Sequence, residues 1–152
     1  MKGPGNSAGD VVSAFVAAQA TRDPAQAMRY LAPGVVFENV PFPPGNETRG
    51  ADRVRVGMET WMAAASRIEW TIHRQVVDGD VVFHERTDEF WYPAGLYPGG
   101  DYCAFRVAAV WEVRGGLIEL WRDYYDLGII KNSLAVDLPE YSRIKHEYIR
   151  GR

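Results

Sequence analysis

The stretch Phe83-His84-Glu85-Arg86-Thr87-Asp88, taken together with Trp121-Arg122-Asp123-Tyr124-Tyr125-Asp126, places charged residues inside two segments that are otherwise typical of buried β-strands. Arg86 and Asp88 are two residues apart, so on one strand they point to the same face of a sheet. A charge on a buried face is costly unless it pairs. A carboxylate on a neighbouring strand completes an Asp–Arg–Asp bridge, in which one acid can stay protonated while the other is ionised. The pattern therefore predicts an acid/base pair that needs no metal, cysteine or histidine.

Strand alternation decides which polar residues share a face. On the strand expected at 81–92, one face carries Val82, His84, Arg86, Asp88 and Phe90. Glu85 and Glu89 lie on the opposite face and are expected in solvent or in surface pairs. The simpler interpretation of Arg86 and Asp88, an ordinary ion pair on a solvated face, stays open because the sequence does not say which face is buried.

Helices and strands are expected in separate parts of the chain. Helices are predicted from Asp10 to about Gln19, from Asp23-Pro24 to about Leu31, from Gly50 to about Ala65 and near 128–135. Strands are predicted at 35–40, 68–77, 81–92, 102–114 and 117–126. Residues 138–152 are expected to form a solvated C-terminal tail. This segregation predicts an α+β fold, with a curved sheet wrapped around helices.

Composition favours one globular domain over residues 1–152. The chain is 47% hydrophobic and 12% aromatic, which argues against disorder. Its formal net charge of −3 offers no broad basic field for nucleic acid. The segment 1–7 is expected to be flexible, and neither a signal peptide nor a membrane span is apparent, so we expect a cytoplasmic protein. Cys103, the single cysteine, is expected to be a buried structural thiol.

Four segments in a fixed order carry a resemblance to a known family. They are Phe37–Pro44 (FENVPFPP), Glu85–Asp88 (ERTD), Trp121–Leu127 (WRDYYDL) and Ala135–Pro139 (AVDLP). Together, over residues 10–139, they resemble the limonene-1,2-epoxide hydrolase family. The resemblance implies the cone-shaped fold of nuclear transport factor 2 and ketosteroid isomerase, in which a strongly curved mixed sheet packs on N-terminal helices and encloses a deep apolar pocket. It also implies a homodimer.

The same resemblance implies roles for individual residues. Asp88 matches the general acid that protonates the epoxide oxygen, and Asp123 matches the base that deprotonates water. Arg86 matches the arginine that bridges the two acids, and Asn39 matches the amide that helps hold the water. The remaining water-holding residue of the family is a tyrosine two positions before that asparagine, and here the position is Phe37.

The implied reaction is the opening of a small hydrophobic epoxide by water to a vicinal diol, in one step and with neither cofactor nor metal. The residues expected to line the substrate pocket are Phe37, His84, Phe90, Trp61 and Tyr125. Tyr125 and His84 are also candidates to replace the missing tyrosine hydroxyl in holding the water. Asp126, next to the acidic motif, is expected to cap the following helix rather than to react.

Two alternatives remain open. A relative of the epoxide-opening cyclases of polyether biosynthesis would use the same acid with a hydroxyl of the substrate as nucleophile. A non-catalytic protein would bind an apolar ligand in the same pocket. The second alternative leaves the acids unexplained, because a simple apolar pocket gains little from burying Arg86, Asp88 and Asp123.

Overall fold

The computed structural model describes residues 7–152 of the chain. Its helices are α1 (Ala8–Ala18), a 3-10 turn (Gln19–Thr21), α2 (Pro24–Met28), α3 (Ala51–Ala64), α4 (Gly128–Leu134) and α5 (Leu138–Arg150). Its strands are β1 (Leu31–Asn39), β2 (Thr48–Arg49), β3 (Arg67–Asp78), β4 (Val81–Trp91), β5 (Tyr102–Arg114) and β6 (Leu117–Tyr124). The predicted flexible segment 1–7 lies, apart from Ser7, outside the described residues.

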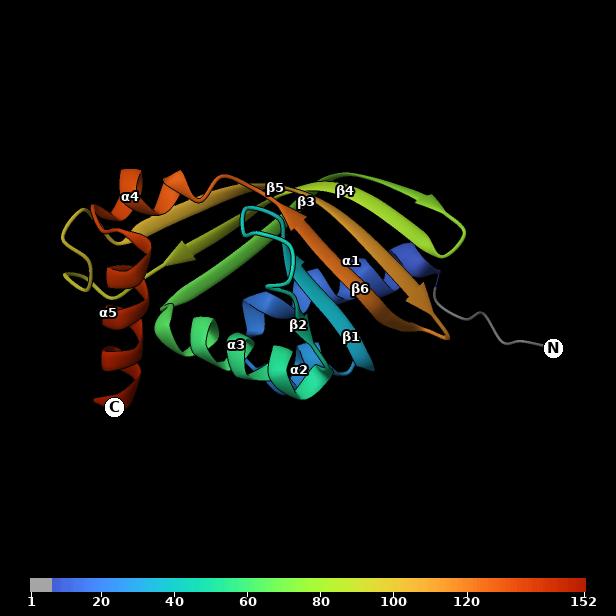
Figure 1. Ribbon diagram of the computed structural model, residues 1–152, viewed down its shortest axis with the longest axis horizontal. Helices are drawn as coiled ribbons and strands as arrows, with labels where there is room; N and C mark the ends of the chain where they lie inside the picture. The colour runs from blue at the N-terminus through green and yellow to red at the C-terminus, as the bar shows by residue number, and fades with distance from the viewer. Residues whose placement is uncertain (1–6) are drawn as a thin grey trace.

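The strands form one mixed sheet in the order β2-β1-β6-β5-β4-β3. β1 runs parallel to β6, and all other neighbours are antiparallel. Figure 1 shows the sheet arching over α1 and α3, with α4 and α5 at one end of the molecule. The predicted α+β class with a curved mixed sheet is confirmed. Within residues 7–152, no helix is long and apolar enough to cross a membrane.

Local capping explains where the first two helices begin. Ser7 is the N-cap of α1 and accepts from the backbone N–H of Asp10, whose carboxylate accepts from the Ser7 N–H in return. The expectation that Asp10 itself caps this helix is therefore wrong by three residues. Asp23 caps α2 as predicted, through the N–H of Ala25. That helix ends at Met28, because Leu31 already belongs to β1.

An aromatic core joins α1 to the sheet. Phe15 packs edge-on against Trp111 and Trp121, with ring centroids 5.6 and 5.0 Å apart. The two indoles stack on each other at 5.4 Å across β5 and β6. All three side chains are essentially inaccessible to solvent, and their burial supplies much of the hydrophobic free energy that holds the helix on the sheet. Cys103 is also buried, as expected.

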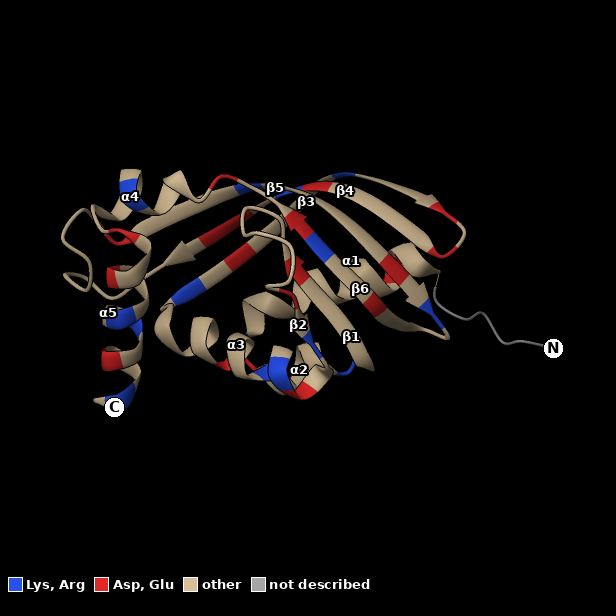
Figure 2. Cartoon of the chain, in the orientation of Figure 1, with Lys and Arg blue, Asp and Glu red and all other residues tan. Residues whose placement is uncertain are grey.

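The C-terminal segment departs from the sequence prediction. Instead of a solvated tail, residues 138–150 form α5, which Asp137 caps through the N–H of Glu140. Pro139 occupies the first turn, where its missing N–H costs nothing. Arg143 pairs with Glu140 and Glu147 on the exposed side. The basic and acidic residues that suggested a solvated tail instead alternate along a helix, as the blue and red segments of Figure 2 show.

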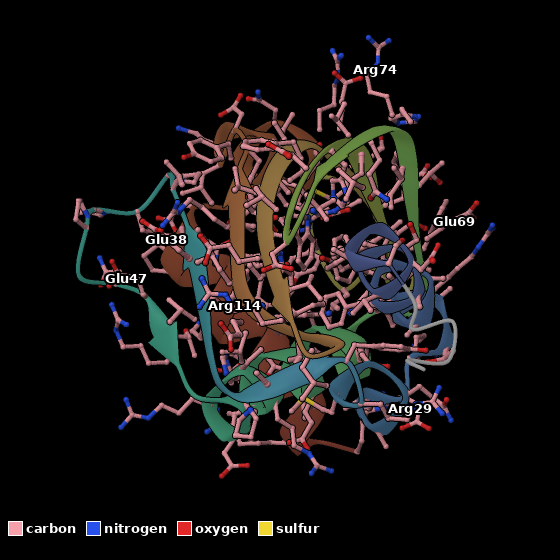
Figure 3. All side chains as sticks on the ribbon, turned by 90° about the vertical axis from the view of Figure 1, so that its right-hand side faces the viewer. Arg29, Glu38, Glu47, Glu69, Arg74 and Arg114 are labelled. Atoms are coloured by element: carbon pink, nitrogen blue, oxygen red, sulfur yellow. The ribbon has the colours of Figure 1, made fainter. Side chains whose placement is uncertain are left out.

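Most charged side chains lie at the surface. Arg29, Arg74 and Arg114 are exposed, and Figure 3 shows labelled charged side chains such as Arg74 reaching away from the ribbon. Arg86 is different, because its side chain is 0% exposed. The fold therefore encloses Arg86, and the groups that pair with it define the candidate site.

Candidate active site

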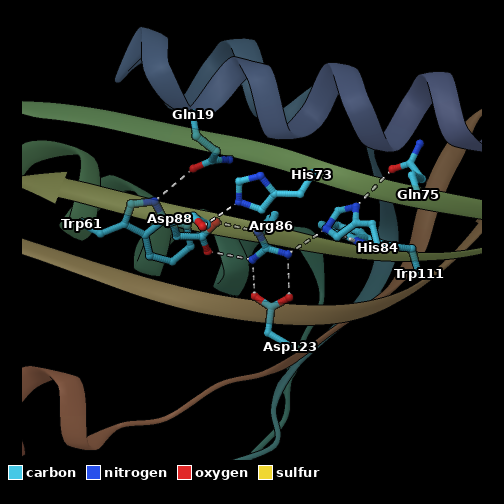
Figure 4. Close-up of polar contacts among 10 residues, drawn as sticks. Gln19, Trp61, His73, Gln75, His84, Arg86, Asp88, Trp111 and Asp123 are labelled. Atoms are coloured by element: carbon cyan, nitrogen blue, oxygen red, sulfur yellow. Dashed lines mark hydrogen bonds and ion pairs between the residues drawn. The ribbon is translucent and has the colours of Figure 1, made fainter.

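Arg86 sits between two carboxylates and is fully hydrogen-bonded. Its Nε and Nη2 donate to Asp88 at 2.6 and 2.8 Å, and its Nη1 and Nη2 donate to Asp123 at 3.0 and 2.8 Å (Figure 4). The second N–H of Nη1 donates to His84 Nε2, and the two nitrogen atoms are 3.0 Å apart. These contacts use all five N–H groups of the guanidinium in two bidentate pairs and one single bond. The solvated-face interpretation of this pair is wrong, because the whole bridge is buried.

The strand order explains how residues far apart in sequence meet. Arg86 and Asp88 lie on the inner face of β4, whereas Asp123 lies on β6, with β5 between them. On its inner face β5 presents Val107, which pairs with Arg86, and Ala109, which pairs with both His84 and Asp123. These side chains are short, so the long arginine reaches across β5 to the next strand.

Asn39 comes to the bridge from the other side. It is the Cα partner of Asp123 in the parallel pairing of β1 with β6. Two residues earlier, Phe37 pairs with Trp121 and stacks on its indole at 3.8 Å. Phe37 and Asn39 are two residues apart on β1, so strand alternation puts them on one face, and both line the same cavity as the acids.

Burial sets the protonation tendencies of the bridge. Burial raises the pKa of Asp88 to about 6, since the hydrogen-bonded Arg86 offsets only part of the lost hydration. The charge of Asp123 raises this pKa further. Burial alone would lower the pKa of Arg86, but the two carboxylates outweigh it and keep the group charged. The guanidinium also lies 4.9 Å from the ring centre of Trp70, a cation–π contact.

His84 lies behind the bridge rather than in the cavity. Its Nε2 accepts from Arg86 Nη1 and, at 3.3 Å, from Trp111 Nε1, so that nitrogen carries no proton. Its Nδ1 therefore donates to Gln75 Oε1 at 3.1 Å. Burial, followed by the charge of Arg86, lowers the pKa of His84 to about 3, which keeps the ring neutral. The expectation that His84 lines the substrate pocket is wrong, and with it the suggestion that this residue replaces the missing hydroxyl.

Gln75 is a site residue that sequence reasoning missed. The register of β3 against β4 shifts between Ile72 and Arg74, so one extra residue reverses the alternation of the strand. Strict alternation from Trp70 would have turned Gln75 outward. After the shift it faces His84 and anchors to α1 through Gly9 O and Ser13 Oγ. The sequence carries no clear signal for this bulge.

A cavity of about 190 Å³ opens onto the bridge. Asp88, Asp123 and Asn39 line it, together with the predicted pocket residues Phe37, Phe90, Trp61 and Tyr125. Most of the remaining lining is apolar or aromatic, including Trp70, Phe105, Val107, Trp121, Leu127 and Ile130. In the described part of the chain, the buried Nε1–H groups of Trp70 and Trp121 have no hydrogen-bond partner. The cavity thus combines a largely apolar wall with a polar region at the bridge.

Asp126 contacts the start of α4, as expected, although the N-cap of that helix is Leu127. Its carboxylate is exposed and accepts from the N–H of Gly128 at the start of α4, at 2.8 Å. It is not among the residues that line the cavity. Of the two acids in the Asp123–Asp126 segment, only Asp123 faces the cavity and touches Arg86.

Comparison with known proteins gives the family of the chain. Residues 6–135 match the family model described as the limonene-1,2-epoxide hydrolase catalytic domain. The chain belongs to the limonene-1,2-epoxide hydrolase family. A relative, epoxide hydrolase EphG of Mycobacterium tuberculosis, is 33% identical over 133 residues, which are 84% of this chain and 83% of EphG.

Solved structures extend the comparison from sequence to fold. A limonene-epoxide-hydrolase-like epoxide hydrolase of M. tuberculosis superposes with a TM-score of 0.69 at 31% identity, covering 90% of this chain and 95% of that one. A Catenulispora acidiphila protein with a ketosteroid isomerase-like fold gives a TM-score of 0.70 at 20% identity, covering 84% and 94%. The second likeness concerns the fold alone, and it confirms the cone-shaped architecture that the family resemblance implied.

Proposed function

We propose that this protein is an epoxide hydrolase that adds water to a hydrophobic epoxide in one step and releases a vicinal diol. The observation that carries the proposal is the buried bridge, in which Arg86 holds Asp88 and Asp123 against one largely apolar cavity. Membership of the family and the similarity to EphG support the same reaction. The body of the proposed substrate is apolar because most of the residues that line the cavity are apolar or aromatic.

Asp88 acts as the general acid. Breaking the C–O bond of an epoxide in a dry cavity leaves an alkoxide unless a proton arrives as the bond breaks. Asp88 suits this role because burial raises the pKa of its carboxyl and favours the protonated form. Its proton passes to the ring oxygen, and the ring carbon becomes open to attack.

Asp123 acts as the general base toward the attacking water. Asn39 is its neighbour across the parallel strands, so a carboxylate and an amide oxygen stand together where a water can bind. The water gives one proton to Asp123 while its oxygen bonds to the epoxide carbon. Because Arg86 contacts both acids, the proton can return from Asp123 to Asp88 through the bridge after turnover.

The acid role gives a pH prediction. Asp88 must be protonated to react, so kcat/KM for diol formation is expected to fall as the pH rises through about 6. The decline should approach tenfold per pH unit above that point. A steady-state profile from pH 5 to 9, with stability checked at each pH, measures it. An activity that rises through the same range would contradict Asp88 as the proton donor.

Phe37 provides a second prediction. Phe37→Tyr is expected to raise kcat for diol formation several-fold, because the added hydroxyl gives the attacking water another partner beside Asn39 and Asp123. Phe42→Tyr, a change of the same size at another cavity-lining phenylalanine, is the matched control. Equal rates in wild type and Phe37→Tyr would mean that the missing hydroxyl does not limit water activation.

The experiment that tests the function is a panel of epoxides incubated in ¹⁸O-labelled water. Hydrolysis places one labelled oxygen in a diol. The absence of the water-holding hydroxyl at Phe37 favours one second candidate, an epoxide-opening cyclase, which would give a cyclic ether without label. Saturable binding with no product from any epoxide would contradict both and favour a binding protein.

We also propose that the protein forms a homodimer through the outer face of its sheet. Val76 and Phe83 pair across β3 and β4 and are 67% and 52% exposed, and Tyr124 on β6 is 44% exposed. Neighbouring apolar side chains exposed on one sheet face, such as the paired Val76 and Phe83, mark a candidate interaction surface. Light scattering during size exclusion tests the proposal, and a monomer at micromolar concentration would contradict it.

A further inference from the structure

Lys145 on α5 is a polar cavity-lining residue that the proposed reaction does not use. Its side chain is half-buried, and its Nζ lies 4.5 Å from the ring centre of Tyr141, one turn earlier on the same helix. The helix is held in place by α3 and by capping at Asp137. Lys145 is therefore presented to the cavity by a regular element rather than by a loop.

Within residues 7–152, Lys145 has neither an ion pair nor a hydrogen-bonded carboxylate. The acidic residues of α5, Glu140 and Glu147, are both occupied by Arg143. Burial lowers the pKa of Lys145 to about 8, and no carboxylate contributes to that shift. At neutral pH the cavity thus holds a largely protonated amine whose lost hydration no protein anion replaces.

The two polar parts of the cavity are separate. Lys145 lies on α5, whereas Asp88 and Asp123 lie on β4 and β6, and both acids pair with Arg86 rather than with Lys145. The groups that complete the cavity wall are apolar or aromatic: Phe90, Phe105, Leu127, Ile130 and Leu138. A ligand complementary to all parts of the cavity has an oxirane beside the two acids, an apolar body along the apolar wall, and an anionic group beside Lys145.

We propose that Lys145 binds the carboxylate of the substrate, so that the substrates are epoxy acids whose acid group is remote from the oxirane. This inference rests on the proposed hydrolase function for the position of the oxirane. A carboxylate on Lys145 makes a charge-assisted hydrogen bond in a site partly shielded from water, where such bonds are strong. An uncharged ester of the same chain length lacks that bond while keeping the apolar contacts.

The test compares a medium-chain epoxy carboxylic acid with its methyl ester. The measured quantity is the ratio of kcat/KM for the acid to kcat/KM for the ester. Lys145→Met should lower this ratio about 10- to 100-fold, mainly through KM for the acid. Lys145→Arg should keep most of the wild-type acid-to-ester ratio, because it keeps the positive charge. Lys131→Met, which removes the same charge from an exposed position on α4, is the control and should leave the ratio at its wild-type value.

A binding measurement separates failure of this inference from failure of the proposed function. Trp61, Trp70 and Trp121 line the cavity, so ligand binding can be followed by tryptophan fluorescence whether or not a diol forms. Suppose that no epoxide is hydrolysed, but the acid binds at least tenfold more tightly than the ester and Lys145→Met removes that difference. This result would support carboxylate binding at Lys145 and contradict the proposed hydrolase function. An acid-to-ester ratio unaffected by Lys145→Met, in both turnover and binding, would overturn the inference.

Discussion

Replacing Asp88 or Asp123 by asparagine is expected to reduce kcat for diol formation by about 10²- to 10⁴-fold each, the usual value of a well-placed general acid or base. Asparagine keeps the shape of the carboxyl but neither gives nor takes the required proton. Because the two acids act in one step through Arg86, the double variant should be little worse than either single variant. Initial rates of diol formation at saturating epoxide measure the effect.

The control for this pair is Glu85→Gln. Glu85 lies on the exposed face of the same strand, directly before Arg86, and its nearest cation is Arg74 at 3.9 Å. The same loss of charge there should leave kcat within about twofold of wild type, since surface substitutions away from special features have small effects. Near-UV circular dichroism verifies that the asparagine variants remain folded. A folded Asp88→Asn or Asp123→Asn protein with more than a tenth of wild-type activity would contradict the assigned roles.

Arg86→Met is expected to lower the free energy of unfolding by about 3–5 kcal/mol at pH 7, because removal of one partner leaves uncompensated buried charge. Without the cation, the buried carboxylates of Asp88 and Asp123 repel each other, and protonation of one of them removes this repulsion. The variant should therefore regain stability, relative to wild type, as the pH falls from 7 to 5. Urea unfolding at several pH values measures both effects.

Arg74→Met provides the comparison for that substitution. Arg74 is exposed, with its side chain 81% accessible, and its contact with Glu85 is long. Its replacement should change the free energy of unfolding by less than about 0.5 kcal/mol. If Arg86→Met cost no more than Arg74→Met, the bridge would not be the stabilising centre of the interior.

The sequence predicted the residues of the buried bridge better than their surroundings. Strand alternation is local, so it placed Arg86 with Asp88 and Phe37 with Asn39 on shared faces, and the pairing of β1 with β6 then brought Asn39 to Asp123. The choice of Asp123 as the second acid depended on the family resemblance. Alternation alone does not reveal that β5 separates the two acids and that its short inner side chains let Arg86 cross.

Two features escaped prediction for physical reasons. The bulge of β3 reverses the alternation after Ile72, so Gln75 faces inward, and His84, expected in the cavity, is held behind the bridge. The mixed charges of the C-terminal segment predict a solvated tail, whereas helical spacing places Tyr141 and Lys145 toward the cavity and Arg143 toward solvent. The amphipathic period was present in the sequence, but the mixed charges obscured it.

The most direct measurement of the central claim is a single-turnover reaction in ¹⁸O-labelled water, with enzyme in excess over epoxide. Direct attack by a water held at Asp123 and Asn39 predicts labelled diol in the first turnover and no label in the protein. An unlabelled diol in that first turnover, with the label found instead in an aspartate of the enzyme, would show a covalent ester intermediate. That result would contradict the account in which Asp88 and Asp123 act only as acid and base.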